Sequence, residues 1–305
     1  MDGLLEKLIS MNIGATIGYV NTSTVAYCDD VVVLSPLEHH MQMLLDGCSE
    51  YAVDWKLSFN PDKSDSYSLK GSDRTFVLGG KPIPSSSGFI YLGLPVGNVK
   101  FVEKFYSERM SKAERAMYSL KPLGCSPNKL HPYAIGFIFK QFCQSILKFG
   151  FEFVHLRKSF LDGLNIRQNL LLKNILGIRH RARFKPLLNE LKVEQVNLAY
   201  VKHKVFGWKQ CVNNQLTLNI FNYLSSLMPN LSNNNFSFIK QLSEVVGSKK
   251  LTVRNVDPIL KELDGNYECN DMSVRELVSS ALKNYHRNEP YFCIQNLNNI
   301  LKIIF

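Results

Sequence analysis

The seven cysteines of this 305-residue chain follow none of the usual functional patterns. They are widely spaced, no two form a Cys-X-X-Cys pair, and none lies near histidines at zinc-ligand spacing. Their odd number also argues against a disulfide framework. The first residues, Met1–Glu6, lack the basic start of a signal peptide. These absences exclude a disulfide-rich scaffold and a zinc-finger protein from the expected classes, and they favour a reducing compartment.

A long uninterrupted hydrophobic run is also missing. The most apolar long window, residues 133–156, is broken by Lys140, Gln141, Lys148 and Glu152, which indicates a buried helix rather than a membrane span. The hydrophobic share of 45% and the charged share of 20% are those of an ordinary globular protein. We therefore expect an intracellular protein, nuclear or cytoplasmic, with no membrane partner and with room for two or three domains.

Positive charge is scarce in the first third of the chain and abundant in the second. Residues 1–99 have a net charge of −5, residues 100–210 of +14 and residues 211–305 of +1. A basic block of this density usually indicates a polyanionic partner such as nucleic acid. The alternative, a group of well-solvated helices without such a partner, remains open at this point.

Two short apolar runs meet at a pair of aspartates in the acidic segment. Thr24–Cys28 and Val31–Leu34 are rich in β-branched and aromatic residues and predict two strands. The two-residue link predicts a tight hairpin with Asp29 and Asp30 at its tip. Two adjacent carboxylates repel each other, and a bound Mg²⁺ would remove that repulsion because it prefers hard oxygen ligands. The alternative is a polar turn that happens to be acidic.

Three motifs in order along the chain resemble those of the reverse transcriptases of non-LTR (LINE-type) retrotransposons. Tyr27-Cys28-Asp29-Asp30 with its apolar flanks resembles the catalytic hairpin of that family. Asn60–Ser64 resembles the next palm motif, although Ser64 stands where threonine is commoner. Tyr91–Pro95 resembles the strand and turn that begin the primer-gripping hairpin. Three ordered matches are much more specific than one short motif.

The resemblance implies an RNA-directed DNA polymerase that uses an RNA template, a DNA primer and a dNTP. It implies that Asp29 and Asp30 bind Mg²⁺ or Mn²⁺, and that Lys63 approaches the triphosphate of the incoming nucleotide. In such enzymes two metal ions clamp the attacking and leaving oxygens, and a further aspartate comes from an earlier strand. The fingers and that strand would lie upstream of Met1, so we expect the chain to bind metal weakly and not to polymerise by itself.

The basic segment that follows predicts a helical, thumb-like domain. Residues 99–120 and 129–156 have helical spacing of apolar residues, with cations between them. Arg179–Lys185 has four permanent cations and an aromatic residue within seven positions. The candidate contacts to nucleic-acid phosphates are Lys104, Arg109, Lys112, Arg115, Arg179, Arg181, Arg183 and Lys185.

Together these patterns predict an α+β fold in three parts. Residues 1–98 would form a partial reverse transcriptase palm, in which helices pack on an antiparallel sheet and Trp55–Phe59 is an alternating strand. Residues 99–212 would form the basic, helical thumb-like domain. Residues 213–305 would form a helical region of unknown role, with short helices such as 257–263 and 273–286.

Three interpretations of function remain open from the sequence. The first is a reverse transcriptase fragment whose missing half is supplied by a longer product. The second is a non-catalytic remnant that binds nucleic acid through the basic helical block. The third is a decayed element product with no present role.

Overall fold

The computed structural model describes residues 2–69, 71, 74–127, 129–183 and 185–227. These residues form two compact units. Residues 2–102 and 211–227 belong to the first unit, and residues 103–210 belong to the second. The mixture of helices with small antiparallel sheets confirms the expected α+β class.

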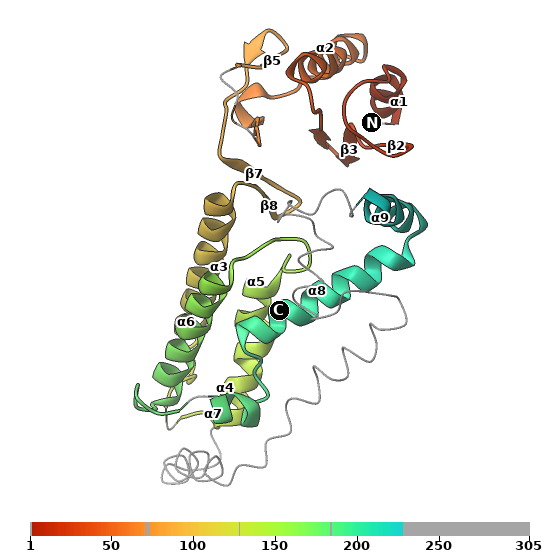
Figure 1. Ribbon diagram of the computed structural model, residues 1–305. Helices are drawn as coiled ribbons and strands as arrows, with labels where there is room; N and C mark the ends of the chain where they lie inside the picture. Colours follow the sequence, from red (N-terminus) through yellow and green to blue (C-terminus); the bar gives the residue numbers. More distant parts are fainter. Residues whose placement is uncertain (1, 70, 72–73, 128, 184, 228–305) are drawn as a thin grey trace. The chain divides into compact units, whose positions relative to one another are not determined.

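The first unit combines helices with short hairpins (Figure 1). Its elements are α1 (Asp2–Ser10), β1 (Thr16–Ile17), β2 (Val20–Asn21), β3 (Thr24–Tyr27), β4 (Asp30–Val33), α2 (Glu38–Asp54), the 3₁₀ turn η1 (Pro61–Lys63), β5 (Val77–Leu78), β6 (Lys81–Pro82), β7 (Gly88–Tyr91), β8 (Leu94–Gly97) and α9 (Gln215–Leu227). The predicted partial antiparallel sheet takes the form of four separate two-stranded antiparallel sheets in the described residues.

All four hairpins turn through two residues, and their backbone angles match the turn types that two-residue hairpins favour. In β5–β6 and β7–β8 both turn residues have positive φ, the pattern of type I′ turns, which match the twist of paired strands. These angles are 56° at Gly79, 78° at Gly80, 49° at Leu92 and 76° at Gly93. In β1–β2 and β3–β4 only the first turn residue has positive φ, 60° at Gly18 and 54° at Cys28, as in type II′ turns.

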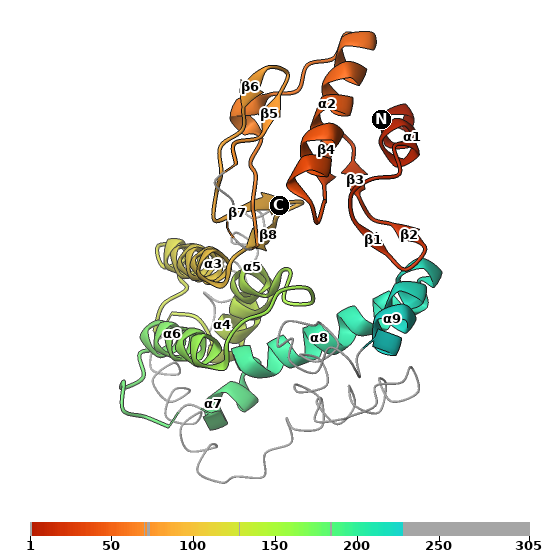
Figure 2. The ribbon, with the colours of Figure 1, turned by 45° about the horizontal axis from the view of Figure 1, so that its top comes forward.

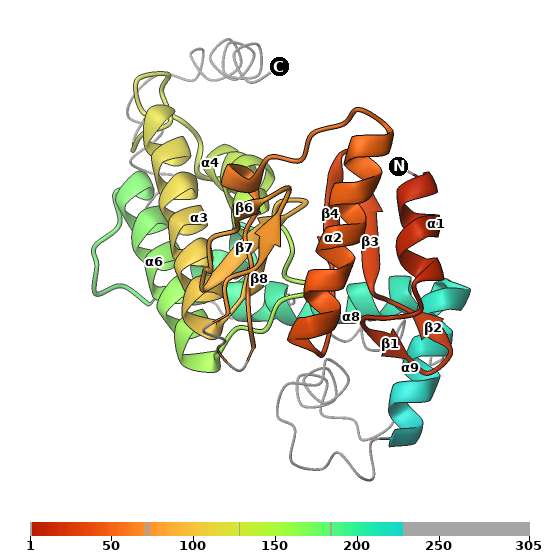
Figure 3. The ribbon, with the colours of Figure 1, turned by 90° about the horizontal axis from the view of Figure 1, so that it is seen from above.

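The core of the first unit lies where α1, α2 and the hairpins meet. Leu4 and Leu8 of α1 and Leu44 of α2 are fully buried there. Val31 and Val33 of β4 pack against the same cluster, and Figures 2 and 3 show α2 beside this hairpin and beside β5. The apolar face of α2 thus holds the base of the β3–β4 hairpin, while the tip of the hairpin remains exposed.

One predicted strand in this unit is wrong. The segment that follows α2, residues 55–60, forms no strand, and Lys56 has a positive φ of 54°. Trp55 stacks on Tyr51 of α2 with ring centroids 5.7 Å apart and is 65% exposed. Trp55 therefore packs on the end of the helix, and the alternating pattern of this segment does not lead to strand pairing.

The second unit is helical in the described residues, as the sequence predicts. It contains most of α3 (Val99–Ser119) and of α8 (Val196–Asn213), together with α4 (Pro132–Ile138), the π-helical turn η2 (Phe139–Cys143), α5 (Gln144–Lys148), α6 (Lys158–Leu176) and α7 (Lys185–Glu190). The helix predicted over residues 129–156 corresponds to α4, η2 and α5, which follow one another without a break over residues 132–148. It is therefore shorter than expected and contains a π-helical turn. A π turn shifts the helical phase, so that Phe139, Cys143 and Gln144 are all buried.

Helices α3 and α6 lie side by side and run in the same direction (Figure 1). Arg157 at the start of α6 pairs with Glu103 near the start of α3. Further along, Arg167 donates two hydrogen bonds to Glu114, at 3.0 and 2.6 Å. Near the ends, the Asn174 amide lies 3.4 Å from the Tyr118 hydroxyl. The two helix C-termini therefore lie at the same end of the pair.

The predicted third part, residues 213–305, is described only up to residue 227. In that stretch α9 is helical as expected, but it belongs to the first unit, where Tyr223 packs against Gly18 of the β1–β2 turn. The predicted helices 257–263 and 273–286 lie outside the described residues.

Candidate functional sites

The two aspartates lie at the tip of a hairpin, one residue later than the sequence predicts. Tyr27 pairs directly with Asp30, so the two-residue turn is Cys28–Asp29 and Asp30 is the first residue of β4. Both aspartates are exposed. The shift follows from the backbone, because a II′ turn needs positive φ at its first residue and Cys28 provides it.

Asp30 lies on the outer face of this hairpin. Residues that pair directly across an antiparallel ladder share a face, so Asp30 lies with Tyr27, and the Val25–Val32 pair lies on the same side. Val31 points to the opposite face and packs on the core. Tyr27 is 61% exposed. The hairpin thus presents a carboxylate and an aromatic ring to solvent while its other face is anchored.

The third motif lies close enough to the first for their side chains to interact. The predicted hairpin at Tyr91–Pro95 is confirmed, with Tyr91 paired with Leu94. Burial raises the pKa of the Tyr91 phenol, and the negative charge of Asp30 raises it further. The Tyr91 hydroxyl is buried and has no hydrogen-bond partner among the described residues. Two motifs separated by some 60 residues therefore lie near enough within the first unit for the charge of one to act on the other.

Lys63, the third predicted catalytic residue, lies in an exposed turn. The Asn60 side chain caps the 3₁₀ turn by accepting a hydrogen bond of 3.0 Å from the Asp62 N–H. The Ser64 hydroxyl closes the turn with a 2.9 Å bond to the Asn60 carbonyl. Lys63 is exposed, and within the described part of the chain no ion pair joins it to Asp29 or Asp30. The second motif therefore forms a well-defined turn, but the described structure shows no direct contact between Lys63 and the two aspartates.

Asp29 and Asp30 are suited to a hard divalent cation such as Mg²⁺ or Mn²⁺, because exposed carboxylate oxygens are the ligands these ions prefer. Among the described residues, no group of three or more histidine, cysteine, aspartate or glutamate side chains could hold a metal ion. The pair by itself therefore supplies only part of the coordination shell of such an ion, and water or substrate oxygens would supply the rest.

Three of the four predicted phosphate contacts on α3 share one exposed face. Lys104, Lys112 and Arg115 are exposed and lie within about 80° of one another around the helix axis. Along the axis they cover about 16 Å. This face, which we call the α3 cation stripe (Lys104, Lys112 and Arg115), borders the side of α3 that contacts α6.

Arg109, the fourth predicted contact on α3, is engaged within the unit. Its guanidinium lies 4.7 Å from the centroids of both the Phe105 and Phe149 rings and donates a 2.9 Å hydrogen bond to the Ile146 carbonyl. Burial lowers its pKa. These contacts join α3 to α5, which is a packing role that the sequence pattern did not indicate.

The second basic cluster lies in the loop after α6. Arg179, Arg181 and Arg183 are all exposed, and the Ala182 N–H donates a 3.0 Å hydrogen bond to the Arg179 carbonyl, which closes a turn. Lys185, also predicted as a contact, is in the first turn of α7, and its side chain lies outside what the structure describes.

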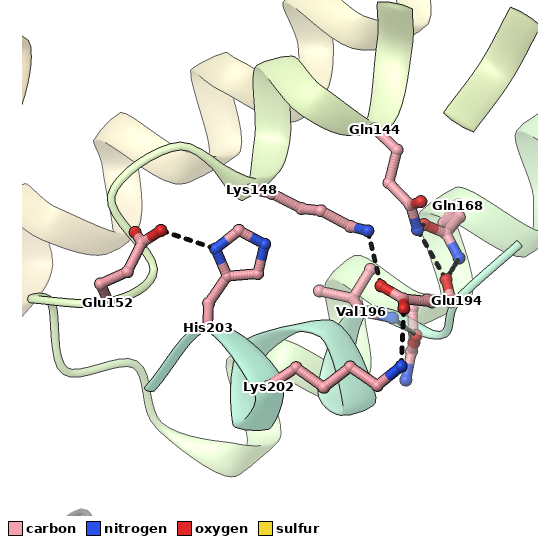
Figure 4. Close-up of polar contacts among 9 residues, drawn as sticks. Gln144, Lys148, Glu152, Gln168, Glu194, Val196, Lys202 and His203 are labelled. Carbon is pink, nitrogen blue, oxygen red and sulfur yellow. Dashed lines mark hydrogen bonds and ion pairs between the residues drawn. The ribbon is translucent and has the colours of Figure 1, made fainter. Parts of the chain in front are cut away.

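A buried polar network in the second unit gave no signal in the sequence (Figure 4). The Glu194 carboxylate contacts the ammonium groups of Lys148 at 2.6 Å and Lys202 at 2.9 Å. Burial raises the pKa of Glu194, but these two cations outweigh burial and lower the pKa to about 2. The Glu194 carbonyl accepts hydrogen bonds from the Gln144 and Gln168 amides at 2.7 and 2.9 Å.

A second buried group surrounds Glu152, which contacts His203 of α8 at 2.7 Å. Burial raises the pKa of Glu152, but hydrogen bonds from His203 and from backbone N–H groups leave the pKa lowered. The neighbouring Lys204 is fully buried, with its ammonium 5.5 Å from the Tyr200 ring centroid, and burial lowers its pKa to about 8. These groups hold α8 against residues 149–157.

The comparisons with known proteins leave the family of the chain open. No protein-family model matches the sequence, and no curated protein matches it. Among the helices that the structure describes, none is both long and apolar enough to cross a membrane.

Proposed function

We propose that the chain is part of an RNA-directed DNA polymerase of the non-LTR retrotransposon type, and that by itself it does not join nucleotides. The observation that supports this most strongly is the exposed Asp29–Asp30 pair at a hairpin tip, with Asp30 near enough to Tyr91 of the third motif for its charge to raise the pKa of that phenol. In this proposal the two carboxylates hold Mg²⁺ or Mn²⁺, Lys63 meets the dNTP triphosphate, and the ligands are an RNA template and a DNA primer.

The expected lack of activity follows from the chemistry of the proposed site. Bound divalent cations would stabilise the charge that develops on the attacking and leaving oxygens, which takes two ions held in a fixed geometry. Two adjacent carboxylates provide few ligands for two ions. We therefore propose weak metal binding, with Asp29 and Asp30 as the residues that carry it. A nuclear or cytoplasmic location is part of the same proposal.

Manganese binding tests the proposed metal site directly. We expect weak Mn²⁺ binding, followed by electron paramagnetic resonance, that is lost in both Asp29→Asn and Asp30→Asn. Asp65→Asn is the matched control, because Asp65 is an exposed aspartate of the same unit outside the hairpin. Equal Mn²⁺ binding by all three variants would contradict the proposed site.

Primer extension tests the proposed inactivity. With an RNA template, a DNA primer, dNTPs and Mg²⁺ or Mn²⁺, we expect no incorporation by the chain. Incorporation that Asp29→Asn abolishes would overturn the proposed inactivity while supporting the polymerase assignment. Incorporation that survives both aspartate substitutions would not come from this site. It would indicate a contaminating enzyme if further purification removes it, and it would contradict the proposed catalytic site if it persists.

A second candidate function is nucleic-acid binding without catalysis, and the α3 cation stripe favours it. Its three exposed cations span about 16 Å, a length comparable to about five phosphates of one strand. Replacing all three by glutamine should reduce the slope of log K against log salt by about two to three. An unchanged slope in a folded triple variant would rule the stripe out as the binding surface.

A further inference from the structure

We infer that Arg179, Arg181 and Arg183 form a preorganised contact to nucleic-acid phosphates, and that the buried Lys173 is the positioning residue that holds this arginine loop (residues 178–183) in shape. The inference rests on the proposed nucleic-acid binding by the second unit and adds a residue that touches no ligand. It is carried by a contact between the interior of α6 and the loop that follows it.

Lys173 is buried but directs its ammonium outward to the loop backbone. It is 8% exposed in the last turns of α6, and its Nζ donates a 2.6 Å hydrogen bond to the His180 carbonyl. His180 lies between Arg179 and Arg181. A charged donor makes a stronger hydrogen bond than a neutral one, so this contact ties the middle of the arginine loop to α6.

Two further contacts fix the ends of the loop. Gly177 ends α6 with a φ of 65°, and a Cβ at this position would lie 2.9 Å from Pro127, so the chain leaves the helix in one direction. The Ala182 N–H then bonds to the Arg179 carbonyl. The loop backbone is therefore fixed where it leaves α6, at His180 and by the turn from Arg179 to Ala182, which lowers the ordering cost of binding a ligand.

The three arginine side chains of the loop are not engaged by other residues that the structure describes. Among the residues that the structure describes, no hydrogen bond or ion pair uses the guanidinium of Arg179, Arg181 or Arg183. Three exposed guanidinium groups on five residues of held backbone match the planar, bidentate recognition that phosphates favour. The α3 cation stripe leads toward the same end of the helix pair, because α3 and α6 run in the same direction.

A structural alternative is that the arginines only offset the partial negative charge at the C-terminus of α6. In that case their removal would lower thermal stability and leave ligand binding unchanged. The two explanations therefore differ in which measurement responds. Fluorescence anisotropy with a labelled RNA–DNA duplex, titrated over salt, measures ligand binding, and thermal unfolding followed by circular dichroism measures stability.

The variant with all three arginines replaced (R179Q/R181Q/R183Q) measures the contribution of the loop. We expect the salt slope to fall by about two to three and the affinity at 0.1 M salt to fall up to about eightfold for each phosphate that is no longer neutralised. The K104Q/K112Q/R115Q variant separates the possible failures. If only this variant weakens binding, the nucleic-acid function stands and the loop inference is wrong. If the unaltered chain shows no salt-dependent binding, the nucleic-acid function itself is wrong.

The Lys173→Met variant tests positioning, because it keeps all three surface arginines. We expect its salt slope to fall nearly as much as that of the triple arginine variant. Combined with that triple variant, it should weaken binding almost no further, since both changes disable the same phosphate-binding loop. Lys173→Arg, which keeps a charged donor, should restore most of the slope.

A slope unchanged in folded Lys173→Met would overturn the positioning role. If Lys173→Met does not fold, Ala182→Pro provides the same test at the surface. It removes the N–H that closes the turn and keeps every charge. An unchanged slope in Ala182→Pro, together with a reduced slope in the triple arginine variant, would show that the arginines bind without preorganisation.

Discussion

The two units of this protein obtain their shapes in different ways. In the first unit, backbone conformation dominates, since four two-residue turns with positive φ set the hairpins that carry the candidate site. In the second unit, side-chain contacts join the helices, as in the Arg167–Glu114 and Glu194–Lys148 pairs. A motif of consecutive residues can encode the first kind of structure, whereas the second depends on partners far apart in the sequence.

Removing the central carboxylate of the second unit should give the largest effect. Glu194→Gln leaves the ammonium groups of Lys148 and Lys202, both mostly buried, without the charge they contact. Breaking such a pair by removing one partner costs about 3 kcal/mol of unfolding free energy. Urea unfolding of the second unit measures this decrease, with Glu108→Gln on the exposed face of α3 as the control. Equal stability of the two variants would show that the network adds nothing.

Adding a side chain where two backbone segments lie close together should destabilise the first unit through steric overlap. A Cβ at Gly97 would lie 2.5 Å from the Gly88 Cα across the β7–β8 pair. Gly97→Ala should therefore cost about 2 kcal/mol through local overpacking, seen as earlier thermal unfolding. Gly163→Ala is the control, since nothing lies within 4 Å of its added Cβ and it lies within a helix. Equal destabilisation by both would contradict the role of the glycine pair.

The buried Lys204 predicts how the stability of the second unit depends on pH. Its pKa is about 8 when folded and returns to its ordinary value of 10.5 when unfolded. Between these values the unfolded chain binds more protons at Lys204, so this lysine makes stability rise with pH from about 8 to 9. Above about pH 9 the trend reverses. Burial raises the pKa of the Cys125 and Cys143 thiols to about 11 and 12 and that of the Tyr200 phenol to about 12, so the unfolded chain loses these protons first.

Lys204→Met tests this dependence. The variant should be more stable than the parent at pH 7, by about 1–2 kcal/mol, because it no longer buries a cation. Its stability should also rise less between pH 8 and 9. Urea unfolding at several pH values measures both. A parent and variant with the same pH dependence would show that Lys204 is not the titrating group.

The smallest predicted effect concerns the turn that carries the aspartates. Cys28 has a φ of 54°, which a residue with a side chain adopts only with strain. Cys28→Gly should raise the unfolding free energy of the first unit by about 0.5 kcal/mol and leave Mn²⁺ binding unchanged. Thermal unfolding and Mn²⁺ titration check both parts. Destabilisation would indicate that the Cys28 side chain contributes contacts of its own.

The local elements were largely predictable from the sequence, and the long-range polar contacts were not. The Asp29–Asp30 hairpin was expected from two short apolar runs separated by two residues, and the turn at Leu92 from the resemblance of Tyr91–Pro95 to a family motif. The one-residue shift of the first turn depends on the φ of Cys28, which no pattern specified. Arg109 was predicted to contact phosphate because it is one of several cations on a basic helix. Its place in the sequence gives no sign of the two phenyl rings, Phe105 and Phe149, that lie beside its guanidinium.

By itself the sequence determined the hairpins, the helices and the division of charge, because each depends on residues near one another in the chain. Only the tertiary structure decided which charged side chains stay exposed and which form hydrogen bonds or ion pairs within the protein. Arg179 remains at the surface while Lys173 bonds to a loop carbonyl. The physical reason is that the environment of a side chain depends on elements brought together by burial, and spacing along the chain does not record them.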